Sequence, residues 1–254
     1  MSDELLLHTE GDVLVLTLNR PHRRNAISMA LARAMADAMA QYAQRDDWRV
    51  AIITGADNTF CSGMDLKGFS QGESPFVPGA GFAGLTQKPP TKPLIAAVEG
   101  FAVAGGCEIA LSCDLIVASD TAQFGLPEVQ RGLIASAGGL MRLPRRLPYH
   151  LAMEMALTGD PIGAPLAFQH GLVNRLVPPG QALTTALALA QRIAQNAPLS
   201  LLASKQIIEQ SATWPIERMF ELQQPYANQI AASHDAQEGA LAFVEKRPAR
   251  WSRR

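Results

Sequence analysis

The stretch of sequence that decides the fold is GFAVAGGCEIALS, residues 100–112, which follows the apolar run LIAAV at residues 94–98. The apolar run predicts a short buried β-strand, and Glu108–Ser112 predicts an apolar helix. Gly105 and Gly106 lie between them, at a helix start where N–H groups lack partners and the helix dipole favours negative charge. Because glycine lets a ligand approach the backbone closely, this strand-to-helix turn is suited to binding an anionic oxygen.

A second turn of the same kind, CSGMDL at Cys61–Leu66, comes earlier in the chain. It follows Val50–Thr54, an apolar run that predicts another short buried strand. Two such turns from neighbouring strands can direct two backbone N–H donors at one oxygen, as in an oxyanion hole, where each donor contributes roughly 3 kcal/mol. We therefore expect Cys61–Leu66 and Ala104–Glu108 to stabilise an enolate or a tetrahedral oxyanion.

The two turns fit other kinds of site less well. Glycine-rich turns also occur for packing alone. The turn at residues 104–106 lacks the GxGxxG spacing of a dinucleotide site, and the chain has no phosphate-binding GxxxxGK[ST] motif. A serine hydrolase also needs an oxyanion hole, but Ser62 has no identifiable histidine partner.

Further segments indicate an α/β domain. Val13–Leu18 and Leu115–Ala118 predict buried strands, and Ile27–Tyr42 has apolar residues at helical spacing, with Ser28 as its N-cap. Strands that alternate with helices are typical of an α/β fold. The Gly-, Pro- and Ser-rich segment Gly68–Pro93 is too long for an ordinary connection, and its phenylalanines favour a lid or pocket wall over a linker.

The last third of the chain changes character. Stretches with helical periodicity follow one another there without strands: Gln181–Gln195, Leu199–Ser211, Ile216–Ile230 and His234–Val244. Consecutive helices of this kind are typical of a separate packing unit that makes subunit contacts. We therefore divide the chain into a core, residues 1–195, and a C-terminal helical oligomerisation region, residues 196–254.

Composition narrows the classes of function. Lys plus Arg total 22 and Asp plus Glu 23, a net charge of −1, whereas nucleic-acid binders cluster basic residues. The three cysteines have no spacing typical of a disulfide framework or a zinc site. The acidic N-terminus is unlike a signal peptide, and no apolar stretch reaches the length of a membrane span. We expect a cytoplasmic protein without a metal site, a nucleic-acid partner or a membrane span.

Glu108 and Glu128 are the candidate acid–base residues. Glu108 precedes Ile-Ala-Leu in the apolar helix, and Glu128 follows FGLP at residues 124–127. Burial raises the pKa of a carboxyl toward the range useful for proton transfer. Taken singly, each residue could equally be a helix-terminal charge or half of a buried ion pair. Beside two glycine turns, the pair favours an enzyme that moves a proton at one carbon and water at the next.

Together these residues resemble the crotonase superfamily, most closely its enoyl-CoA hydratase and isomerase branch. The resemblance covers nearly the whole chain, through an ordered and specific set of motifs: Asn19-Arg20-Pro21, Asn25-Ala26, Phe60–Lys67, Gly100–Asp114, Phe124–Glu128, Gly138-Gly139, Arg142-Leu143 and Phe243–Pro248. It implies a spiral of repeated ββα units, with C-terminal helices that assemble trimers, often paired into hexamers. It also implies hydration of an enoyl-CoA without a metal or redox cofactor, coenzyme A being part of the substrate.

Residue by residue, the resemblance assigns the chemistry. The backbone N–H groups of Met64 and Gly105 are the expected oxyanion donors. Glu108 is expected to activate water for attack at C3 of a trans-2-enoyl-CoA, and Glu128 to deliver a proton to C2 of the thioester enolate. Coenzyme A is expected against two segments, at Arg24, Ala26, Ser62, Asp65, Leu66 and Lys67, with Lys246 or Arg247 reaching in from a neighbouring subunit.

One position departs from the pattern of the hydratases. Ser136 stands where they have a glycine whose N–H helps hold the reacting water, and serine adds a hydroxyl beside the reaction centre. Leu140-Met141 replaces a polar pair, and carnitinyl-CoA dehydratase-like relatives also have apolar residues there. The alternatives are therefore a dehydratase of a functionalised acyl-CoA, an isomerase that needs only Glu128, and an acyl-CoA-binding scaffold with a silent site.

Overall fold

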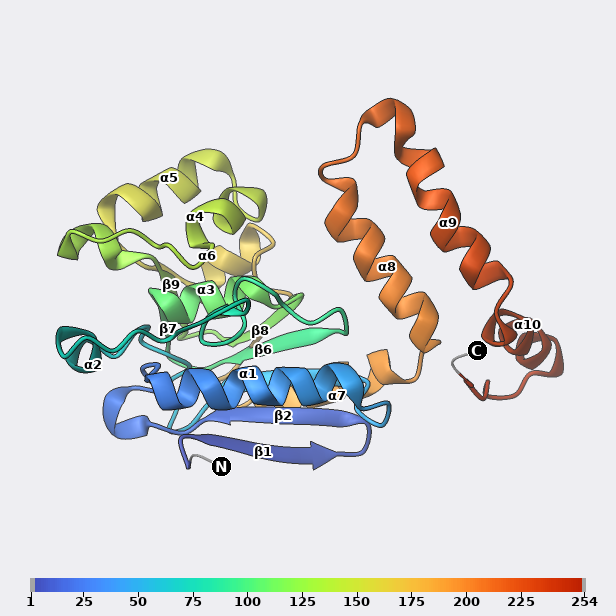
Figure 1. Ribbon diagram of the computed structural model, residues 1–254, viewed down its shortest axis with the longest axis horizontal. Coiled ribbons are helices and arrows are strands. Elements are labelled where there is room, and N and C mark those ends of the chain that lie inside the picture. The colour runs from blue at the N-terminus through green and yellow to red at the C-terminus, as the bar shows by residue number, and fades with distance from the viewer. Residues whose placement is uncertain (1–2, 253–254) are drawn as a thin grey trace.

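Six strands form the main sheet in a computed structural model that describes residues 3–252 (Figure 1). Their order is β1-β2-β3-β6-β8-β11, and all neighbours are parallel except the antiparallel pair β1 and β2. The strands span Leu5–Glu10 (β1), Val13–Leu18 (β2), Val50–Gly55 (β3), Leu94–Val98 (β6), Leu115–Ser119 (β8) and Arg175–Val177 (β11). The four buried strands predicted from apolar runs are confirmed as β2, β3, β6 and β8, and the α/β fold class with them.

Helices cover both faces of this sheet, which is why its central strands are apolar without alternation. Successive side chains of a strand point to opposite faces. Ile52 accordingly packs toward α7 (Ala182–Ala194) on one face, and Ile53 packs into the larger core on the other. That larger core includes apolar residues of α1 (Met29–Gln44) and α3 (Gly105–Ser112).

Strands β6 to β9 alternate between the main sheet and a small three-stranded sheet of order β10-β9-β7. The small sheet consists of Phe101–Val103 (β7), Gln123–Gly125 (β9) and Ile162–Gly163 (β10). β6 lies in the main sheet, β7 in the small sheet, and α3 follows; β8 and β9 repeat the alternation. This is the repeated ββα pattern that the resemblance implies.

The turn at residues 100–108 differs from its prediction in one respect. We expected it to lead from the main sheet directly into a helix starting at Glu108, but β7 intervenes and α3 begins at Gly105. The apolar residues 101–103 pair with β9, so they form a strand and not a loop. A Cβ on Gly106 would lie 2.1 Å from the carbonyl oxygen of Cys61, so close packing explains a glycine inside the first helical turn.

Residues 68–93 contain short elements instead of one long loop. Helix α2 (Leu66–Ser70) leads into the segment and is capped by the side chain of Asp65. Strands β4 (Phe76–Val77) and β5 (Gly81–Phe82) form a hairpin, and β4 contacts α1. Figure 1 shows α2 at one edge of the fold.

Shorter helices lie in the connections between strands. They are η1 (Pro21–Arg23), η2 (Pro127–Arg131), α4 (Gly139–Arg142), η3 (Leu143–Arg145), α5 (Tyr149–Thr158) and α6 (Ala164–Gln169), the η elements being 3-10 helices. The N-cap predicted at Ser28 is confirmed, because its side chain accepts a hydrogen bond from the Leu31 N–H at the start of α1.

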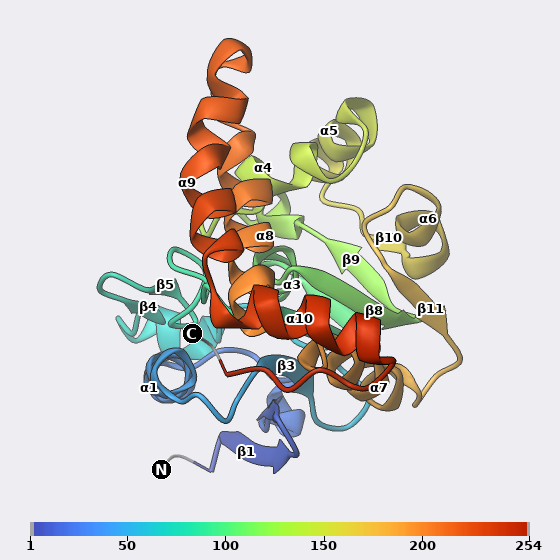
Figure 2. The same cartoon turned by 90° about the vertical axis from the view of Figure 1, so that its right-hand side faces the viewer.

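The last helices stand beside the core and not on it (Figure 1, Figure 2). They are α8 (Pro198–Ser211), η4 (Ile216–Arg218), α9 (Met219–Ala231) and α10 (His234–Glu245). With α7, they correspond to the four predicted helical stretches, although a 3-10 turn begins the third. Large apolar side chains are highly exposed on this part of the chain: Ile208, Ile216, Phe220, Phe243 and Val244.

Residues 3–252 offer neither a helical membrane span nor a metal cluster. None of the helices in that range is long and apolar enough to cross a membrane. The same residues hold no group of three or more His, Cys, Asp or Glu side chains arranged to bind a metal ion.

Candidate active site

The two glycine turns run side by side. Cys61 bridges to Ala102 in parallel register: the Cys61 N–H donates to the carbonyl of Phe101 at 2.8 Å, and the Val103 N–H donates to the carbonyl of Cys61 at 3.1 Å. This pairing places residues 61–66 against residues 103–106. We call these two segments the glycine wall.

Small residues bring the two halves of the glycine wall into contact. Gly63 has a φ of +99°, and a Cβ there would lie 2.8 Å from the Cβ of Ala104 and 3.2 Å from the Gly105 nitrogen. Ala104 itself has a φ of +52°, a conformation that is strained for a residue with a side chain. The backbone at Met64 and Gly105 is therefore held close together by packing that only glycine at position 63 allows.

The N–H groups of Met64 and Gly105 are the predicted oxyanion donors. Gly105 is the first residue of α3, and the first N–H groups of a helix have no partner within it. Met64 bridges to Ile27, but the bonds of that bridge are donated by the N–H groups of Ile27 and Asp65, not by that of Met64. Both Met64 and Gly105 line a cavity beside the glycine wall.

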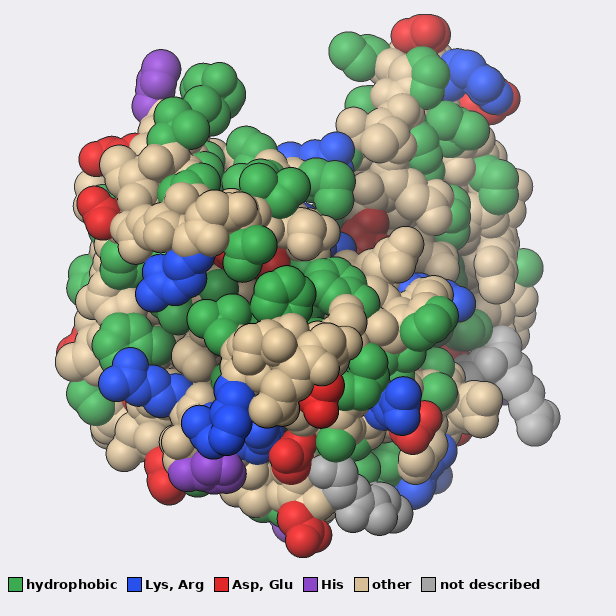
Figure 3. All heavy atoms as spheres, turned by 60° about the vertical axis from the view of Figure 1, so that its left-hand side comes forward, with side chains coloured by type: hydrophobic (Ala, Val, Ile, Leu, Met, Phe, Trp, Pro, Cys, Tyr) green, Lys and Arg blue, Asp and Glu red, His purple; other side chains and the backbone are tan. Residues whose placement is uncertain are grey.

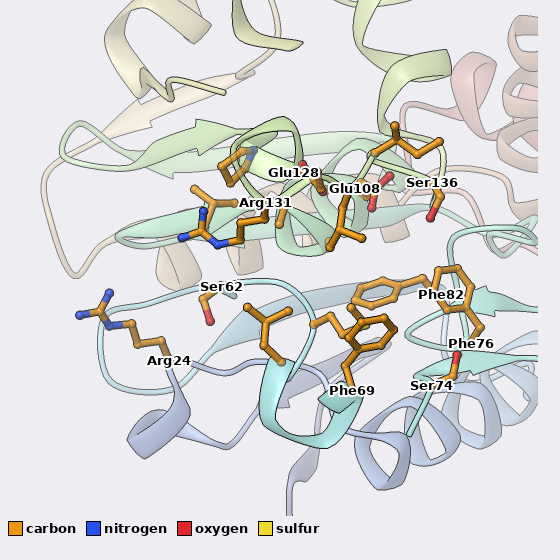
Figure 4. Close-up of a pocket in the computed structure, with 18 residues that line it drawn as sticks. Arg24, Ser62, Phe69, Ser74, Phe76, Phe82, Glu108, Glu128, Arg131 and Ser136 are labelled. Carbon is orange, nitrogen blue, oxygen red and sulfur yellow. The ribbon is translucent and has the colours of Figure 1, made fainter. Parts of the chain in front are cut away.

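This cavity has a volume of about 400 Å³, and its lining is mainly apolar. Residues singled out from the sequence line it, among them Arg24, Ser62, Met64, Leu66, Gly105, Glu108, Glu128 and Ser136, and so do three phenylalanines of the expected pocket wall, Phe69, Phe76 and Phe82. Figure 4 shows Glu108, Glu128 and Ser136 on one side, with Ser62 and Phe69 on the other. Figure 3 shows one face of the molecule, where hydrophobic side chains gather in the middle and basic side chains lie around them.

Glu108 is held by two backbone donors. The residue is only 3% exposed, and its Oε1 accepts hydrogen bonds from the N–H groups of Ala137 (2.7 Å) and Gly139 (2.9 Å). Burial raises the pKa of Glu108 to about 7, and the negative charge of Glu128 adds to this rise. The two N–H bonds and the positive charge of Arg142 oppose it, because they lower the pKa. A carboxyl with a pKa near neutral can both accept and donate a proton at physiological pH.

Glu128 is the second carboxyl of the cavity. It lies in η2, directly after Pro127, and is partly buried. Its Oε2 is buried and has no hydrogen-bond partner among residues 3–252. Burial raises the pKa of Glu128 as well. We call Glu108, Glu128 and residues 135–139, which hold Glu108, the carboxylate wall.

Three predicted coenzyme A contacts lie outside the cavity. Asp65 caps α2, accepting hydrogen bonds from the N–H groups of Lys67 and Gly68, and pairs with Arg20 at 2.8 Å. Asp65 and Lys67 line a separate, more polar hollow. The carbonyl of Ala26 accepts a hydrogen bond from Arg20. The Asp65 side chain therefore serves local structure, and the contacts of Ala26, Asp65 and Lys67 with coenzyme A stay predictions.

Arg247, predicted to reach a neighbouring subunit, is engaged within its own chain. It pairs with Glu238 at 2.6 Å and with Glu245 at 2.5 Å. Lys246, the other residue of that prediction, is the C-cap residue that follows α10 and has a φ of +54°.

Two further sequence patterns in residues 68–84 do not form the sites that their spacing suggests. Residues 68–72 read GFSQG, the GxSxG spacing of a serine hydrolase, but Ser70 ends the short helix α2 and its hydroxyl donates to the carbonyl of Lys67. Residues 79–84 read GAGFAG, the GxGxxG spacing of a dinucleotide site, but they form the β4–β5 hairpin and no helix follows them. A strand-to-helix context is absent in both cases.

Other residues of the cavity escaped the sequence interpretation. The N–H donors of Ala137 and Gly139 could have been suspected from the small residues around Gly138-Gly139. Arg131, Leu133 and Ile134 line the cavity from the end of η2 and the loop after it. Nothing in their spacing signals a site, because they are exposed residues of an irregular segment.

Comparison with known proteins decides the family. The family model described as enoyl-CoA hydratase/isomerase matches residues 8–254. The chain belongs to the enoyl-CoA hydratase/isomerase family. This confirms the resemblance to the crotonase superfamily, and the chain is a crotonase-family enzyme.

Three individual relatives match this chain over their whole length and over its own. It is 50% identical to an enoyl-CoA hydratase from Mycobacterium tuberculosis H37Rv, whose crystal structure matches with a TM-score of 0.97 over 100% of both chains. It is 41% identical to the carnitinyl-CoA dehydratase of Proteus mirabilis strain HI4320, over 100% of both chains. A carnitinyl-CoA hydratase from Mycobacterium avium is 41% identical, with a TM-score of 0.80 over 100% of both chains.

Proposed function

We propose that this enzyme hydrates trans-2-enoyl-CoA to 3-hydroxyacyl-CoA by syn addition through a thioester enolate. The observation that carries the proposal is that Glu108 and Glu128, both with a raised pKa, face one cavity beside the paired glycine turns. Two carboxyls of this kind can move two protons, which is what adding water across a double bond requires.

The chemistry divides between the two walls. The N–H groups of Met64 and Gly105 would bind the thioester oxygen and stabilise it as charge develops on the enolate. Glu108 would accept a proton from water as the water oxygen bonds to C3. Its Oε1 already accepts two N–H groups, which leaves Oε2 for water. Glu128 would donate a proton to C2 as the enolate collapses.

The coenzyme A part of the substrate would lie beside Arg24 and Ser62. Both residues line the main cavity and also an adjoining hollow of about 290 Å³, so the cavity and the hollow meet at these residues. In Figure 4 Arg24 lies at the end of the cavity away from Phe76 and Phe82. The phosphates would then lie near a guanidinium, and the acyl chain would lie toward the phenylalanines.

The second candidate is a hydratase or dehydratase of a functionalised acyl-CoA. Two of the relatives above act, by their names, on carnitinyl-CoA. In this chain Ser136 places a hydroxyl group on the lining of the cavity, where it can bind a polar substituent. An isomerase that uses Glu128 alone and a silent acyl-CoA-binding scaffold are the further alternatives that the same assay decides.

The test is the loss of enoyl-thioester absorbance with crotonyl-CoA and its longer homologues, with carnitinyl-CoA assayed in the dehydration direction. Turnover of any simple enoyl-CoA supports hydration. Turnover of carnitinyl-CoA alone would select the second candidate. If only a 3-enoyl-CoA is converted, the enzyme is an isomerase, and binding without conversion of any of these thioesters would identify a scaffold.

We also propose that the enzyme assembles as a homotrimer or a pair of trimers through its C-terminal helices. Exposed apolar side chains are costly unless a partner covers them, and the five most exposed large ones all lie on this part of the chain. Phe220 is 85% exposed on α9, and Phe243 is 85% exposed on α10. Sedimentation of the wild type against a Phe220→Ser, Phe243→Ser variant tests this assembly.

The cytoplasm is the compartment we propose. Its support is that Cys61, Cys107 and Cys113 are free and buried, as is typical of a reducing environment. Fractionation of cells that express the tagged chain would test it.

A further inference from the structure

Arg142 connects the carboxylate wall to a second segment of the chain. It ends α4, directly after the loop that holds Glu108, and is half-buried. Its Nη1 donates to the carbonyl of Ala137 at 3.3 Å, and its Nη2 donates to the carbonyl of Thr86 at 2.7 Å. Ala137 and Thr86 are distant in sequence, so one guanidinium joins two otherwise separate segments.

At one end, Arg142 holds the residue that positions Glu108. The Ala137 N–H donates to Glu108 Oε1, while the Ala137 carbonyl accepts from Arg142. Gly138 makes room for this contact, because a Cβ there would lie 2.1 Å from Nη1 of Arg142. Movement of the guanidinium would therefore move the peptide that orients the carboxylate.

At the other end, Arg142 reaches the segment behind the glycine wall. Thr86 is buried, and its N–H donates to the carbonyl of Phe82 at 3.1 Å. The Phe82 ring lies directly against Gly105, where a Cβ would meet two of its carbons at 2.4 Å. The chain of contacts thus runs from Glu108 through Arg142 to the backing of the Gly105 donor.

Arg142 also contributes charge to Glu108. Its positive charge lowers the pKa of Glu108, opposing the effects of burial and of Glu128. The other charged or titratable groups that influence Arg142 are Arg146 directly after η3, Cys113 at the end of α3, and Glu209 on α8.

We propose that Arg142 is a positioning residue that braces the carboxylate wall against the glycine wall and so sets the distance between Glu108 and the thioester. The proposal rests on the hydratase function proposed above. Lysine could not replace it fully, because a single ammonium lacks the planar fork that reaches two carbonyls on two segments. Arg142 does not line the cavity, so it acts through its neighbours and not on the substrate.

The experiment compares Arg142→Met and Arg142→Lys with the wild type, using Arg145→Met as the matched control. Arg145 is an exposed arginine of the adjoining η3. We expect Arg142→Met to lower kcat on crotonyl-CoA by about 10- to 100-fold, as displaced catalytic groups do, with KM changed by less than about threefold. Arg142→Lys should recover only part of kcat, and Arg145→Met should match the wild type.

A second readout is independent of activity. The pKa of Glu108 is measured by NMR of ¹³C-labelled glutamate carboxyls, with Glu108→Gln for assignment. Without the neighbouring positive charge, the pKa should rise in Arg142→Met, and in Arg142→Lys it should stay near the wild-type value. The acid limb of the kcat profile should move to higher pH by the same amount in Arg142→Met.

The outcomes separate this proposal from the hydratase assignment. If the wild type converts crotonyl-CoA but Arg142→Met keeps its kcat and its Glu108 pKa, Arg142 is a packing residue and the brace is refuted. If the wild type converts no enoyl-CoA, the proposed function fails, and the Glu108 pKa alone then supports or refutes the link to Arg142. If Arg142→Met does not fold, an undiminished kcat in Arg142→Lys would refute the brace.

Discussion

The two walls of the cavity act through different chemical groups: one through its backbone and the other through its side chains. The glycine wall presents backbone N–H groups, and its side chains matter chiefly by being small, as Gly63 and Gly106 show. The carboxylate wall presents side chains, and there the backbone serves them: two N–H groups are directed at Glu108. The same element, α3, contributes Gly105 to the first wall and Glu108 to the second.

This difference indicates which substitutions should impair each wall. A backbone N–H donor is kept when its own side chain is changed, but it is displaced when a new bulky atom pushes the backbone aside. A carboxyl fails when one oxygen is exchanged for nitrogen, although packing is unchanged. Substitutions in the two walls should therefore differ in both the size and the kind of their effects.

The largest effect is expected from Glu108→Gln and Glu128→Gln. Each removes a proton-transfer group while keeping its shape, so we expect kcat for enoyl-CoA hydration to fall by roughly 10³-fold with substrate binding kept. Steady-state kinetics and binding of the CoA thioester measure the two quantities, with Glu154→Gln on the exposed face of α5 as control. Full activity of Glu108→Gln toward a 3-enoyl-CoA would show instead that the carboxylate wall serves isomerisation.

The same substitution at Glu108 should stabilise the fold at high pH. The pKa of Glu108 is raised from about 4.5 to about 7, so its stabilising contribution is complete below pH 4.5 and is lost as the pH rises through 7. Glu108→Gln should therefore raise the free energy of unfolding by up to about 3 kcal/mol at pH 8 and by much less at pH 5. Urea unfolding at both pH values checks this, with exposed Glu217→Gln as control; an equal effect at both would contradict the raised pKa.

Gly105→Ala should damage the glycine wall by displacement. The new Cβ would lie 2.4 Å from the buried ring of Phe82, so the ring or the N–H of residue 105 must shift. We expect kcat to fall by about 10- to 100-fold, part of the value of one oxyanion donor. Gly163→Ala is the matched control, since its nearest neighbour would be at an ordinary 3.6 Å. Equal kinetics for the two variants would remove Gly105 from the site.

Met64→Leu should have the smallest effect. The volume is nearly unchanged and the N–H group is kept, so we expect kcat and KM within about threefold of the wild type. Kinetics on crotonyl-CoA measure this. A loss as large as that of Glu108→Gln would mean that the side chain of Met64, not its backbone, acts at the site.

The sequence predicted the glycine wall more fully than the carboxylate wall. Apolar runs followed by glycine mark strand ends, and the parallel pairing of the neighbouring strands β3 and β6 places residues 61–66 and 103–106, which follow them, side by side. The apolar residues next to Glu108 and Glu128 in the sequence predict burial, which made these two residues candidates for proton transfer. Their support is harder to foresee, because Ala137 and Gly139 reach Glu108 across 29 and 31 residues and only the small residues around Gly138-Gly139 hint at it.

Long-range contacts also explain the other differences. β7 was not expected because three residues form a strand only where a partner, here β9, is present. The ion pair of Asp65 with Arg20, 45 residues away, was likewise not expected, and the contact of Asp65 with coenzyme A stays a prediction. Spacing along the chain carries the local signal, and these partners come from the tertiary fold.

The central claim is that both carboxyls act from one side of a substrate whose thioester is held by the glycine wall. Figure 4 shows Glu108 and Glu128 on the same side of the cavity, so water and proton should reach the same face of the double bond. The most direct test is hydration of crotonyl-CoA in D₂O with the product analysed by NMR. We expect one diastereomer, with deuterium at C2 added syn to the C3 hydroxyl group. Anti addition, or deuterium distributed over both C2 positions, would contradict the claim.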